Sequence, residues 1–381
     1  MRTQMGAKAE RCEDLPKMQV CLLGQAEEEV MIVRMLKLKL TARQEKVLET
    51  WLWNLTGVWN WAIKKIEHDT HDKVYHSQKD FQNLLAEHGE RLGIPSHTLQ
   101  GMLVQAHISW QRCFRKTARK PRLKGARNRL SSIPFPDPIR LPRGNRIVIP
   151  GLGKVKYHSQ ELPDARIKCG RIVRRASGWH LCLWLDTDHR FSVKDTKAAV
   201  GIDPGFSTLL TLSDGTKIAN PRELRKGARR LTQAQRGNRR NLVARLQERQ
   251  ANRRSDRNHK ISRRLVENYG TICYSDDNFR GMARRFGKSI SEAALGDLIR
   301  KLDYKCRAGG RGLKPVNSKH TTMTCSACGS LTGPRGWGGL AVREWECSAC
   351  GAVHDRDVNA AKVVLMTGLG ASHEGRQRRV A

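Results

Sequence analysis

Apolar and polar residues follow two periods along the first part of the chain, one typical of strands and one of helices. Residues 33–40 alternate apolar with basic side chains, which predicts a strand. Thr41 then caps a predicted helix whose apolar residues recur at helical spacing: Leu48, Trp51, Leu52, Leu55, Val58, Trp59, Ala62, Ile63 and Ile66. Residues 81–92 and 96–118 predict two more helices, and Ser96 is the expected cap of the second.

Residues 131–186 are rich in short β segments bounded by proline and glycine. Four of these segments are predicted strands: 146–149, 154–157, 166–174 and 179–185. Together with residues 33–40 they are expected to close a small β-barrel. The helices would then be inserted between the first strand of the barrel and the others.

The remainder of the chain mixes strands and helices. A mostly polar hinge at 186–196 precedes three predicted strands within 198–219. A long helix or helix hairpin follows at 222–264. Shorter elements complete the pattern, with strands at 270–274 and 313–316 and helices at 291–306 and 357–366. The fold class is therefore α+β, with several domains.

Net charge narrows the expected partners. The chain has 381 residues and a formal net charge of +35, so polyanions should be attracted through release of their counterions. A membrane surface is disfavoured, because no lipidation motif or amphipathic anchor supports it, and no apolar run is long enough to span a bilayer. We expect nucleic acid as the partner, and neither a membrane nor a small-molecule substrate.

Four of the eleven cysteines form two Cys-x-x-Cys knuckles separated by eighteen residues: Cys325, Cys328, Cys347 and Cys350. Each knuckle turns two thiolates to one side, and two knuckles complete a tetrahedral shell, so this spacing predicts a structural Zn²⁺ site. The other cysteines are scattered, which fits a reducing cytoplasm.

Acidic residues stand where two predicted strands end. Asp203 follows the apolar run 198–202, and Ser275, Asp276 and Asp277 follow the strand at 270–274. A third acid, Asp357, lies seven residues beyond the last knuckle cysteine. Carboxylates grouped in this way are typical of nucleases that hold two Mg²⁺ ions about 4 Å apart.

The order Gly-Ile-Asp203-x-Gly, two-knuckle ribbon, Arg356-Asp-x-Asn-Ala-Ala resembles the TnpB proteins of bacterial transposons. These are RNA-guided RuvC-like nucleases related to type V CRISPR effectors and to Fanzors. The resemblance covers roughly residues 35–365, and its most specific part is the ribbon with the motif that follows it.

This resemblance implies a division of the chain into domains. Residues 1–30 are expected to be a disordered leader, and 368–381 a basic tail. The domains between them would be a wedge β-barrel (31–40 and 131–186), a helical recognition lobe (41–130), a RuvC/RNase H-like α/β domain (197–318 and 354–367) and a zinc ribbon (319–353).

The resemblance also implies three acids, and the sequence departs from it at the second. Asp203 and Asp357 match the first and third. The expected glutamate is replaced by Ser275 in one arrangement known in the family and by Ser318 in another. Serine is neutral and a poor ligand for Mg²⁺.

Several outcomes follow from this departure. Asp277 lies two residues beyond Ser275 and would face the same side of an extended strand. Asp276 would reach the site after a bulge, and Glu292 from its helix. Without any such replacement the protein would be a nuclease-dead binder or transcriptional repressor that holds its target without cutting it.

Two basic regions are candidates for phosphate contact. Residues 222–264 carry sixteen Lys or Arg and three acids, and this excess of one sign favours phosphate binding over a solvated helix face. The candidate contacts are Arg229, Arg230, Arg236, Arg239, Arg240, Arg245, Arg253 and Arg254, with Lys116, Arg119 and Lys120 in the N-terminal lobe. Trp53 and Trp61 lie off the apolar stripe of their helix and are further candidates for contact with bases or backbone.

The expected partners are thus a guide RNA and double-stranded target DNA, which would place the protein at the nucleoid. A compact type V CRISPR effector is a close alternative, and the alternative from another class is a guide-free basic zinc-ribbon protein that binds nucleic acid. A DDE transposase is disfavoured, because the ribbon lies between the second and third acidic positions.

Overall fold

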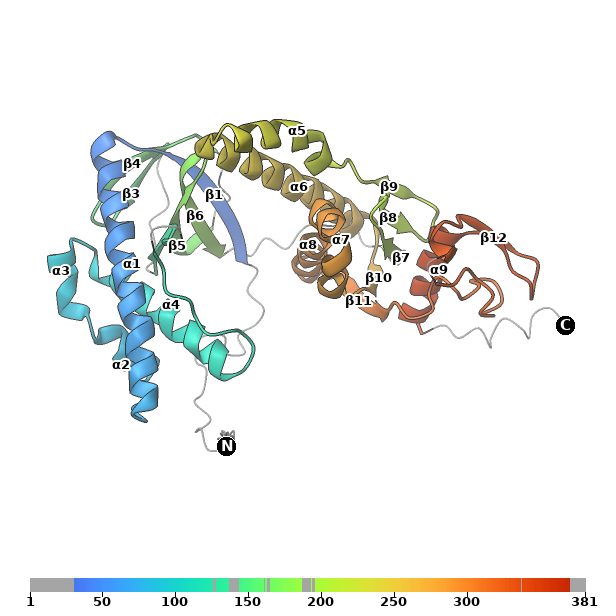
Figure 1. The fold of residues 1–381 in the computed structure, drawn as a ribbon, viewed down its shortest axis with the longest axis horizontal. Helices are drawn as coiled ribbons and strands as arrows, with labels where there is room; N and C mark the ends of the chain where they lie inside the picture. The colour runs from blue at the N-terminus through green and yellow to red at the C-terminus, as the bar shows by residue number, and fades with distance from the viewer. Residues whose placement is uncertain are drawn as a thin grey trace, which may run out of the picture.

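The computed structural model describes residues 31–125, 128–136, 144–160, 162, 165–186, 193, 196–336 and 338–370. The predicted leader, most of the hinge and most of the basic tail lie outside these residues. Figure 1 shows an elongated molecule with one sheet and its helices at each end, bridged by a long helix pair. None of the described helices is both long and apolar enough to cross a membrane.

The N-terminal part combines a six-stranded sheet with four α-helices. Its strands run in the order β2-β5-β6-β1-β4-β3. They are β1 (Met31–Lys39), β2 (Ser132–Phe135), β3 (Arg146–Ile149), β4 (Gly153–Tyr157), β5 (Arg166–Arg175) and β6 (Gly178–Asp186). The strand β1 pairs with β6 along most of its length and with β4 at its end. The predicted strands therefore join through β1 as expected, but no pairing closes the sheet between β2 and β3 in the described residues, which leaves a half-barrel.

The helices of this part are α1 (Ala42–His71), α2 (Gln78–Asn83), α3 (Gly89–Leu92) and α4 (Ser96–Phe114), with the 3-10 turn η1 (Ala86–His88). Thr41 forms the predicted cap of α1. The single helix expected at 81–92 was wrong, because the chain breaks there into α2, η1 and α3. The cap expected at Ser96 was also wrong, since Pro95 holds the N-cap position of α4 and its side chain forms no capping hydrogen bond.

The C-terminal part contains a five-stranded sheet in the order β11-β10-β7-β8-β9. Its strands are β7 (Ala199–Pro204), β8 (Thr208–Leu212), β9 (Lys217–Ala219), β10 (Thr271–Asp276) and β11 (Gly312–Asn317). The strands β7, β10 and β11 are parallel, whereas β7, β8 and β9 form an antiparallel meander. The carboxyl ends of the three parallel strands therefore meet at one edge.

Helices cover both faces of this sheet. The helices of this part of the chain are α5 (Glu223–Arg236), α6 (Arg240–Asn268), α7 (Phe279–Ala293), α8 (Leu295–Ala308) and α9 (Arg356–Gly368). Apolar residues of α6 and α8 cover one face, and α9 covers the other. The helix expected at 291–306 was misjudged, because the chain breaks at Ala294, whose φ is 52°, and α7 begins much earlier.

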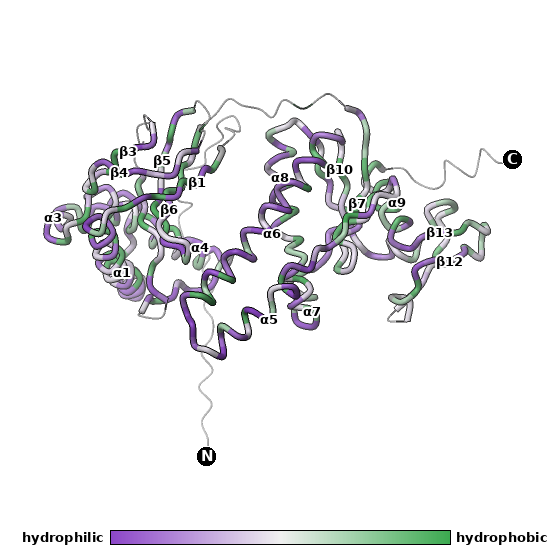
Figure 2. The backbone as a smooth tube through the Cα atoms, turned by 90° about the horizontal axis from the view of Figure 1, so that it is seen from above, coloured by the Kyte–Doolittle hydropathy of each residue, from purple (hydrophilic) through white to green (hydrophobic). Residues whose placement is uncertain are grey.

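Two smaller features complete the fold. The basic stretch 222–264 forms the α5–α6 hairpin, which extends toward the six-stranded sheet (Figure 1). The tube of α6 is mostly hydrophilic along its length (Figure 2). A cysteine ribbon with strands β12 (Glu344–Glu346) and β13 (Val353–Asp355) and the short 3-10 turn η2 (Gly338–Leu340) precedes α9.

Candidate metal centres and nucleic-acid interface

Strand alternation decides which residues at the sheet edge face α9. In β7, Val200 and Ile202 pack toward α6 and α8, so Gly201 and Asp203 face the other side. In β10, Ile272 and Tyr274 pack toward α6 and α8, whereas Cys273 packs with α9. The strands β7 and β10 are parallel, and Ile202 is paired with Tyr274. Ser275, the next residue on the same face as Cys273, therefore lies beside Asp203.

The helix α9 lies directly on this face of the sheet. A Cβ added to Gly201 would lie 2.0 Å from the backbone oxygen of Ala361 and 2.7 Å from the backbone nitrogen of Leu365. Only glycine permits this approach. Because Asp357 lies one turn before Ala361, the close contact places it near the end of β7.

Electrostatics show that three of the predicted acids lie together. The pKa of Asp203 is raised to about 8 by burial and by the charges of Asp357 and Asp277, with Arg356 acting in the opposite direction. Burial also raises the pKa of Asp277. Three segments distant in sequence, around 203, 277 and 357, therefore place carboxylates at one edge of the sheet.

The two serines at which a glutamate was expected both contact Asp277. The Ser275 hydroxyl donates to Oδ2 of Asp277 over 3.1 Å, and Ser318 also hydrogen-bonds to this carboxylate. Both bonds oppose the rise in the pKa of Asp277 that burial causes. Ser275 is 1% exposed, so its hydroxyl is enclosed beside the carboxylate.

Asp357 is held by two arginines. Its Oδ1 lies 2.9 Å from Nη2 of Arg356, and its Oδ2 lies 3.4 Å from Nη1 of Arg343. Asp355, two residues earlier, caps α9 by accepting from the backbone N–H of Val358 over 2.9 Å. The two acids thus have separate roles, one at the sheet edge and one in the helix cap.

The structure does not bring the other two candidates to this edge. Asp276 is exposed and follows Ser275 on the opposite side of the strand. Burial, and then the charge of Asp276, raise the pKa of Tyr274, which faces α6 and α8. Glu292 is 2% exposed and binds Arg225, accepting from its backbone N–H over 3.1 Å and pairing with its guanidinium over 3.2 Å. Its role in the structure is therefore to fix the start of α5 against α7.

The predicted cysteines form a compact cluster. The four sulfurs lie within 4.8 Å of one another, with 3.8 Å between Cys325 and Cys350 and 3.6 Å between Cys328 and Cys347. A tetrahedral Zn²⁺ with bonds of about 2.3 Å requires sulfurs about 3.8 Å apart. The donor set and its spacing therefore fit Zn²⁺. Within the described part of the chain, no other set of three or more ligand atoms is gathered so closely.

Neighbouring residues support the cysteine cluster and tie it to α9. The ring nitrogen Nε2 of His354 lies 3.0 Å from Sγ of Cys325, and Thr332 donates to Sγ of Cys347 over 3.1 Å. Asn359, buried in α9, donates to the backbone oxygen of Thr324 over 2.7 Å and accepts from the N–H of Ser326 over 2.8 Å. Sequence reasoning missed His354, although its position four residues after the last knuckle was a usable signal.

Comparison with known proteins agrees with this arrangement. A family model described as "Probable transposase" matches residues 183–285, and one described as "Cas12f1-like, TNB domain" matches 296–364. A "Putative RNA-guided DNA endonuclease" of Streptomyces pristinaespiralis is 34% identical over 299 residues, covering 73% of each chain. The "TnpB-like protein L79" of Acanthamoeba polyphaga mimivirus is 26% identical over 208 residues, covering 47% of this chain and 39% of its own.

This chain belongs to the TnpB family. The family predicted from the ribbon and the acidic motifs is thereby confirmed. A Cas12f1 solved in complex with sgRNA and target DNA shares the fold, with a TM-score of 0.59, 13% identity, and coverage of 85% of this chain and 83% of its own. The likeness shows that this TnpB-family chain and that structure share a fold of mixed helices and sheets.

The basic hairpin of this TnpB-family protein exposes most of the arginines predicted to bind phosphate. Six of them are exposed and form no ion pair with the described residues: Arg229, Arg230, Arg236, Arg239, Arg240 and Arg245. Arg253 instead pairs with Glu223 over 2.9 Å. Arg254 donates to the backbone oxygen and to the hydroxyl of Ser291, which ties α6 to the end of α7.

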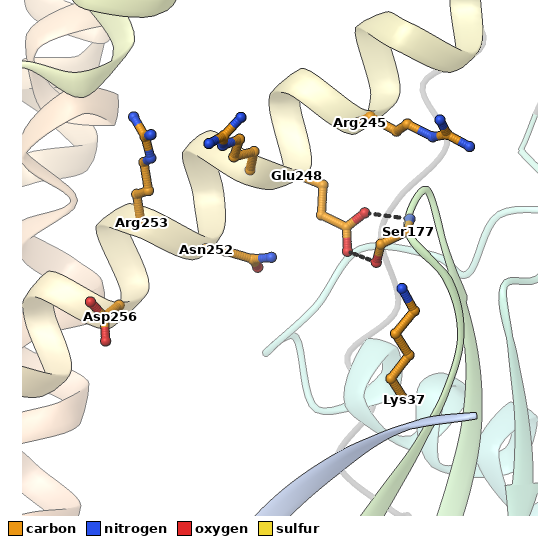
Figure 3. A pocket seen from close by; sticks show the side chains of 8 residues that line it. Lys37, Ser177, Arg245, Glu248, Asn252, Arg253 and Asp256 are labelled. Carbon is orange, nitrogen blue, oxygen red and sulfur yellow. Dashed lines mark hydrogen bonds between the residues drawn. The ribbon is translucent and has the colours of Figure 1, made fainter. Parts of the chain in front are cut away.

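One acid of α6 joins the two parts of the molecule. Glu248 accepts from the backbone N–H of Ser177 over 2.8 Å and from its hydroxyl over 2.7 Å, at the turn between β5 and β6. Figure 3 shows this contact beside a pocket lined by Lys37, Arg245 and Arg253. The hairpin is therefore fixed to the half-barrel by an acid, in a pocket that is lined by more basic than acidic side chains.

A second basic segment follows α4. Asn60 clamps this segment with two hydrogen bonds of 2.7 Å to the backbone of Lys124, and the indole of Trp59 donates to the backbone oxygen of Arg122 over 3.1 Å. Lys116 and Arg119 are exposed, whereas Lys120 pairs with Glu67.

Proposed function

We propose that this chain is an RNA-guided DNA endonuclease whose RuvC-like centre consists of Asp203, Asp277 and Asp357. The observation that carries this proposal is the convergence of the three carboxylates at one edge of the sheet. Burial, and then the charges of Asp357 and Asp277, raise the pKa of Asp203, and a bound divalent cation would stabilise its ionised form.

The order of the five-stranded sheet supports an RNase H-like assignment for 197–318 and 354–367. The ribbon at 319–353 would be a structural zinc module that positions α9 through Asn359. The half-barrel of 31–40 and 131–186 would be the wedge, and the helices within 41–130 the recognition lobe.

Asp277 is assigned as the second acid for a geometric reason. It follows β10 on the α9 face, and it accepts hydrogen bonds from Ser275 and Ser318, the two positions where the family resemblance places a glutamate. Two hydroxyls can hold a shorter acid in the space that a glutamate would otherwise occupy. Asp276 and Glu292 lack this placement.

The carboxylate oxygens of Asp203, Asp277 and Asp357 are hard donors of the kind that Mg²⁺ prefers. Bound Mg²⁺ would activate a water molecule and stabilise the leaving oxygen of a phosphodiester. The chain's own task is to keep Asp203 and Asp277 turned toward α9, and to hold Asp357 through Arg356 and Arg343. The same arginines offset part of the negative charge, so the site can persist before a cation binds.

The partners proposed are a guide RNA and double-stranded target DNA. The relatives are named as RNA-guided endonucleases, and the exposed arginines of α5 and α6 suit a phosphate backbone. Base pairing by the guide would read the sequence, while the protein would hold the duplex through its backbone. Binding to DNA would place the protein at the nucleoid.

A direct experiment co-expresses the chain with the DNA that flanks its gene. RNA retained after a high-salt wash is sequenced, and a plasmid carrying the matching target is incubated with the complex and Mg²⁺. The proposal requires one discrete RNA and guided cutting. Absence of any discrete RNA would instead favour a guide-free zinc-ribbon protein.

A second function is favoured by a specific observation. Asp357 already carries two arginine partners, and the three carboxylates are more widely spread than the cysteine sulfurs. A protein that binds its guided target without cutting, and so acts as a repressor, would show this arrangement. Tight target binding without cutting at any Mg²⁺ concentration would identify it.

A further inference from the structure

An exposed aromatic stripe lies along α1, on the side away from its apolar core. Trp53 is 65% exposed and Trp61 is 37% exposed, whereas Trp51 on the same helix is 2% exposed. Trp53, Gly57 and Trp61 stand four residues apart, so they follow one another along a single face. Two large apolar side chains placed in this way expose surface that folding alone would not select.

Gly57 leaves a notch between the two indoles. No heavy atom lies within 4 Å of the position that a Cβ would take there, and the residue has helical backbone, so the turn does not require a glycine. Glycine within a helix is destabilising relative to alanine, which points to a use for the open space. The eight residues from Trp53 to Trp61 span about 12 Å along the axis, enough for planar groups to insert.

One of the indoles is held in a fixed orientation. Trp61 stacks on the fully buried Phe81, with ring centroids 6.4 Å apart and planes 19° from parallel. One face of its ring is therefore supported by the core of the lobe, while the residue stays partly exposed. A ring supported in this way loses little conformational freedom when a second planar group stacks on it.

The flanks of the stripe are basic. Lys46 and Lys64 are exposed on the same face, one on each side of the tryptophans. The three glutamates of α1 have other partners: Glu49 pairs with Arg174 over 2.7 Å, Glu67 pairs with Lys120, and Glu45 accepts from the indole of Trp179 over 3.3 Å. An apolar protein partner would meet ammonium groups on both sides, whereas a polyanion with planar bases matches both features.

We propose that Trp53, Gly57 and Trp61 form a stacking platform for unpaired bases of a single-stranded nucleic acid, with Lys46 and Lys64 contacting its phosphates. This inference rests on the proposed function, since a guided nuclease carries an RNA with unpaired segments and opens a DNA duplex. The shared chemistry is a strand with exposed bases, and its source is either that RNA or the displaced DNA strand.

The test uses the full chain, stripped of RNA, with oligouridylate and oligothymidylate as probes. Trp53→Ala and Trp61→Ala should each weaken binding roughly 5- to 150-fold, because stacking on one aromatic contributes about that much per base. The dependence of affinity on salt should keep its slope, since no phosphate contact is removed. Preference for one probe identifies RNA or DNA as the source.

Matched variants separate stacking from loss of structure. Gly57→Leu should fill the notch and weaken binding with both tryptophans present, and Trp53→Phe should retain most of the affinity. Tyr75→Ala, which removes an exposed aromatic outside α1, should have no effect. Lys64→Ala should instead lower the salt slope by about one.

Three results would overturn the platform: unchanged affinity of Trp53→Ala and Trp61→Ala, a changed salt slope in these variants, or a wild-type dimer that Trp53→Ala converts to a monomer. If the platform alone is wrong, the wild-type protein still co-purifies with one discrete guide RNA. Failure of the proposed function would appear differently, as a wild type that carries no discrete RNA although its oligonucleotide binding still depends on the tryptophans.

Discussion

The cysteine cluster and the acidic edge both meet the first turns of α9, where Asn359 and Asp357 are only two residues apart, yet the two regions are built differently. The four sulfurs already stand at tetrahedral spacing, and nearby N–H and O–H groups support them. The carboxylates come from three distant segments and repel one another, and Asp357 among them is held by two arginines. The proposed structural metal site is thus built by short local loops, whereas the proposed catalytic site gathers like charges from distant segments.

The largest effect should follow from breaking the cluster. Cys325→Ser should lose the bound Zn²⁺ and unfold the ribbon, because structural zinc sites contribute their binding energy to folding. Metal analysis of the purified protein and limited proteolysis of 319–353 measure this. Cys113→Ser, which changes a half-buried cysteine in α4, is the control and should keep both the zinc content and the resistance of residues 319–353 to proteolysis. Full zinc content in Cys325→Ser would refute the assignment.

The next effect concerns the approach of α9 to β7. Gly201→Ala should destabilise the C-terminal part by about 3 kcal/mol or more, since the new methyl group would collide with backbone atoms that cannot move independently. Chemical denaturation measures the loss. Gly57→Ala is the matched control, because its Cβ meets open space and alanine favours the helix.

A smaller effect should follow from cutting the link between the two centres. Asn359→Ala removes two buried hydrogen bonds to Thr324 and Ser326 and should cost about 2 kcal/mol. Asn359→Asp keeps the acceptor for Ser326 and should cost less in the same denaturation experiment. If Asn359→Ala left both stability and Mg²⁺ binding unchanged, the ribbon would not position α9.

The smallest effect has the opposite sign. Asp203→Asn should stabilise the metal-free protein by about 1 kcal/mol at neutral pH, because burial and the neighbouring acids disfavour the ionised form that Asp203 adopts in the unfolded chain. The pKa of Asp203 in the folded state, about 8, exceeds its ordinary value of 3.8. Its stabilising contribution is therefore full below the ordinary value and is lost as the pH rises toward 8. Thermal unfolding in a chelator should show this decline in the wild type and a flatter profile in Asp203→Asn; equal profiles would contradict it.

Local patterns predicted much of this fold. The alternation at β1, the helical spacing of α1 and the paired knuckles each depend on neighbours a few residues apart. The break at Ala294 was not visible, because alanine favours helices and only tertiary packing imposes its positive φ. The gap between the edge strands β2 and β3 was missed for a similar reason, since sequence alone does not show whether two distant strands pair.

The candidate site was predictable in part. Motifs located Asp203, Asp357 and the cysteines, but the choice among Asp276, Asp277 and Glu292 depended on which face each residue occupies relative to α9. Likewise, a basic composition did not reveal that Arg253 and Arg254 serve internal contacts. Such assignments require the register between strands and the packing of helices on them.

Cutting of a guided target in Mg²⁺ tests the central claim most directly. The complex carrying wild-type protein should cut the matched plasmid, Asp277→Ala should bind it without cutting, and Asp276→Ala should cut normally. Adding Ser275→Glu to Asp277→Ala should restore cutting by returning a carboxylate to the same space. Asp277→Ala that cuts as fast as the wild type, or a wild type that binds without cutting, would contradict the proposed centre.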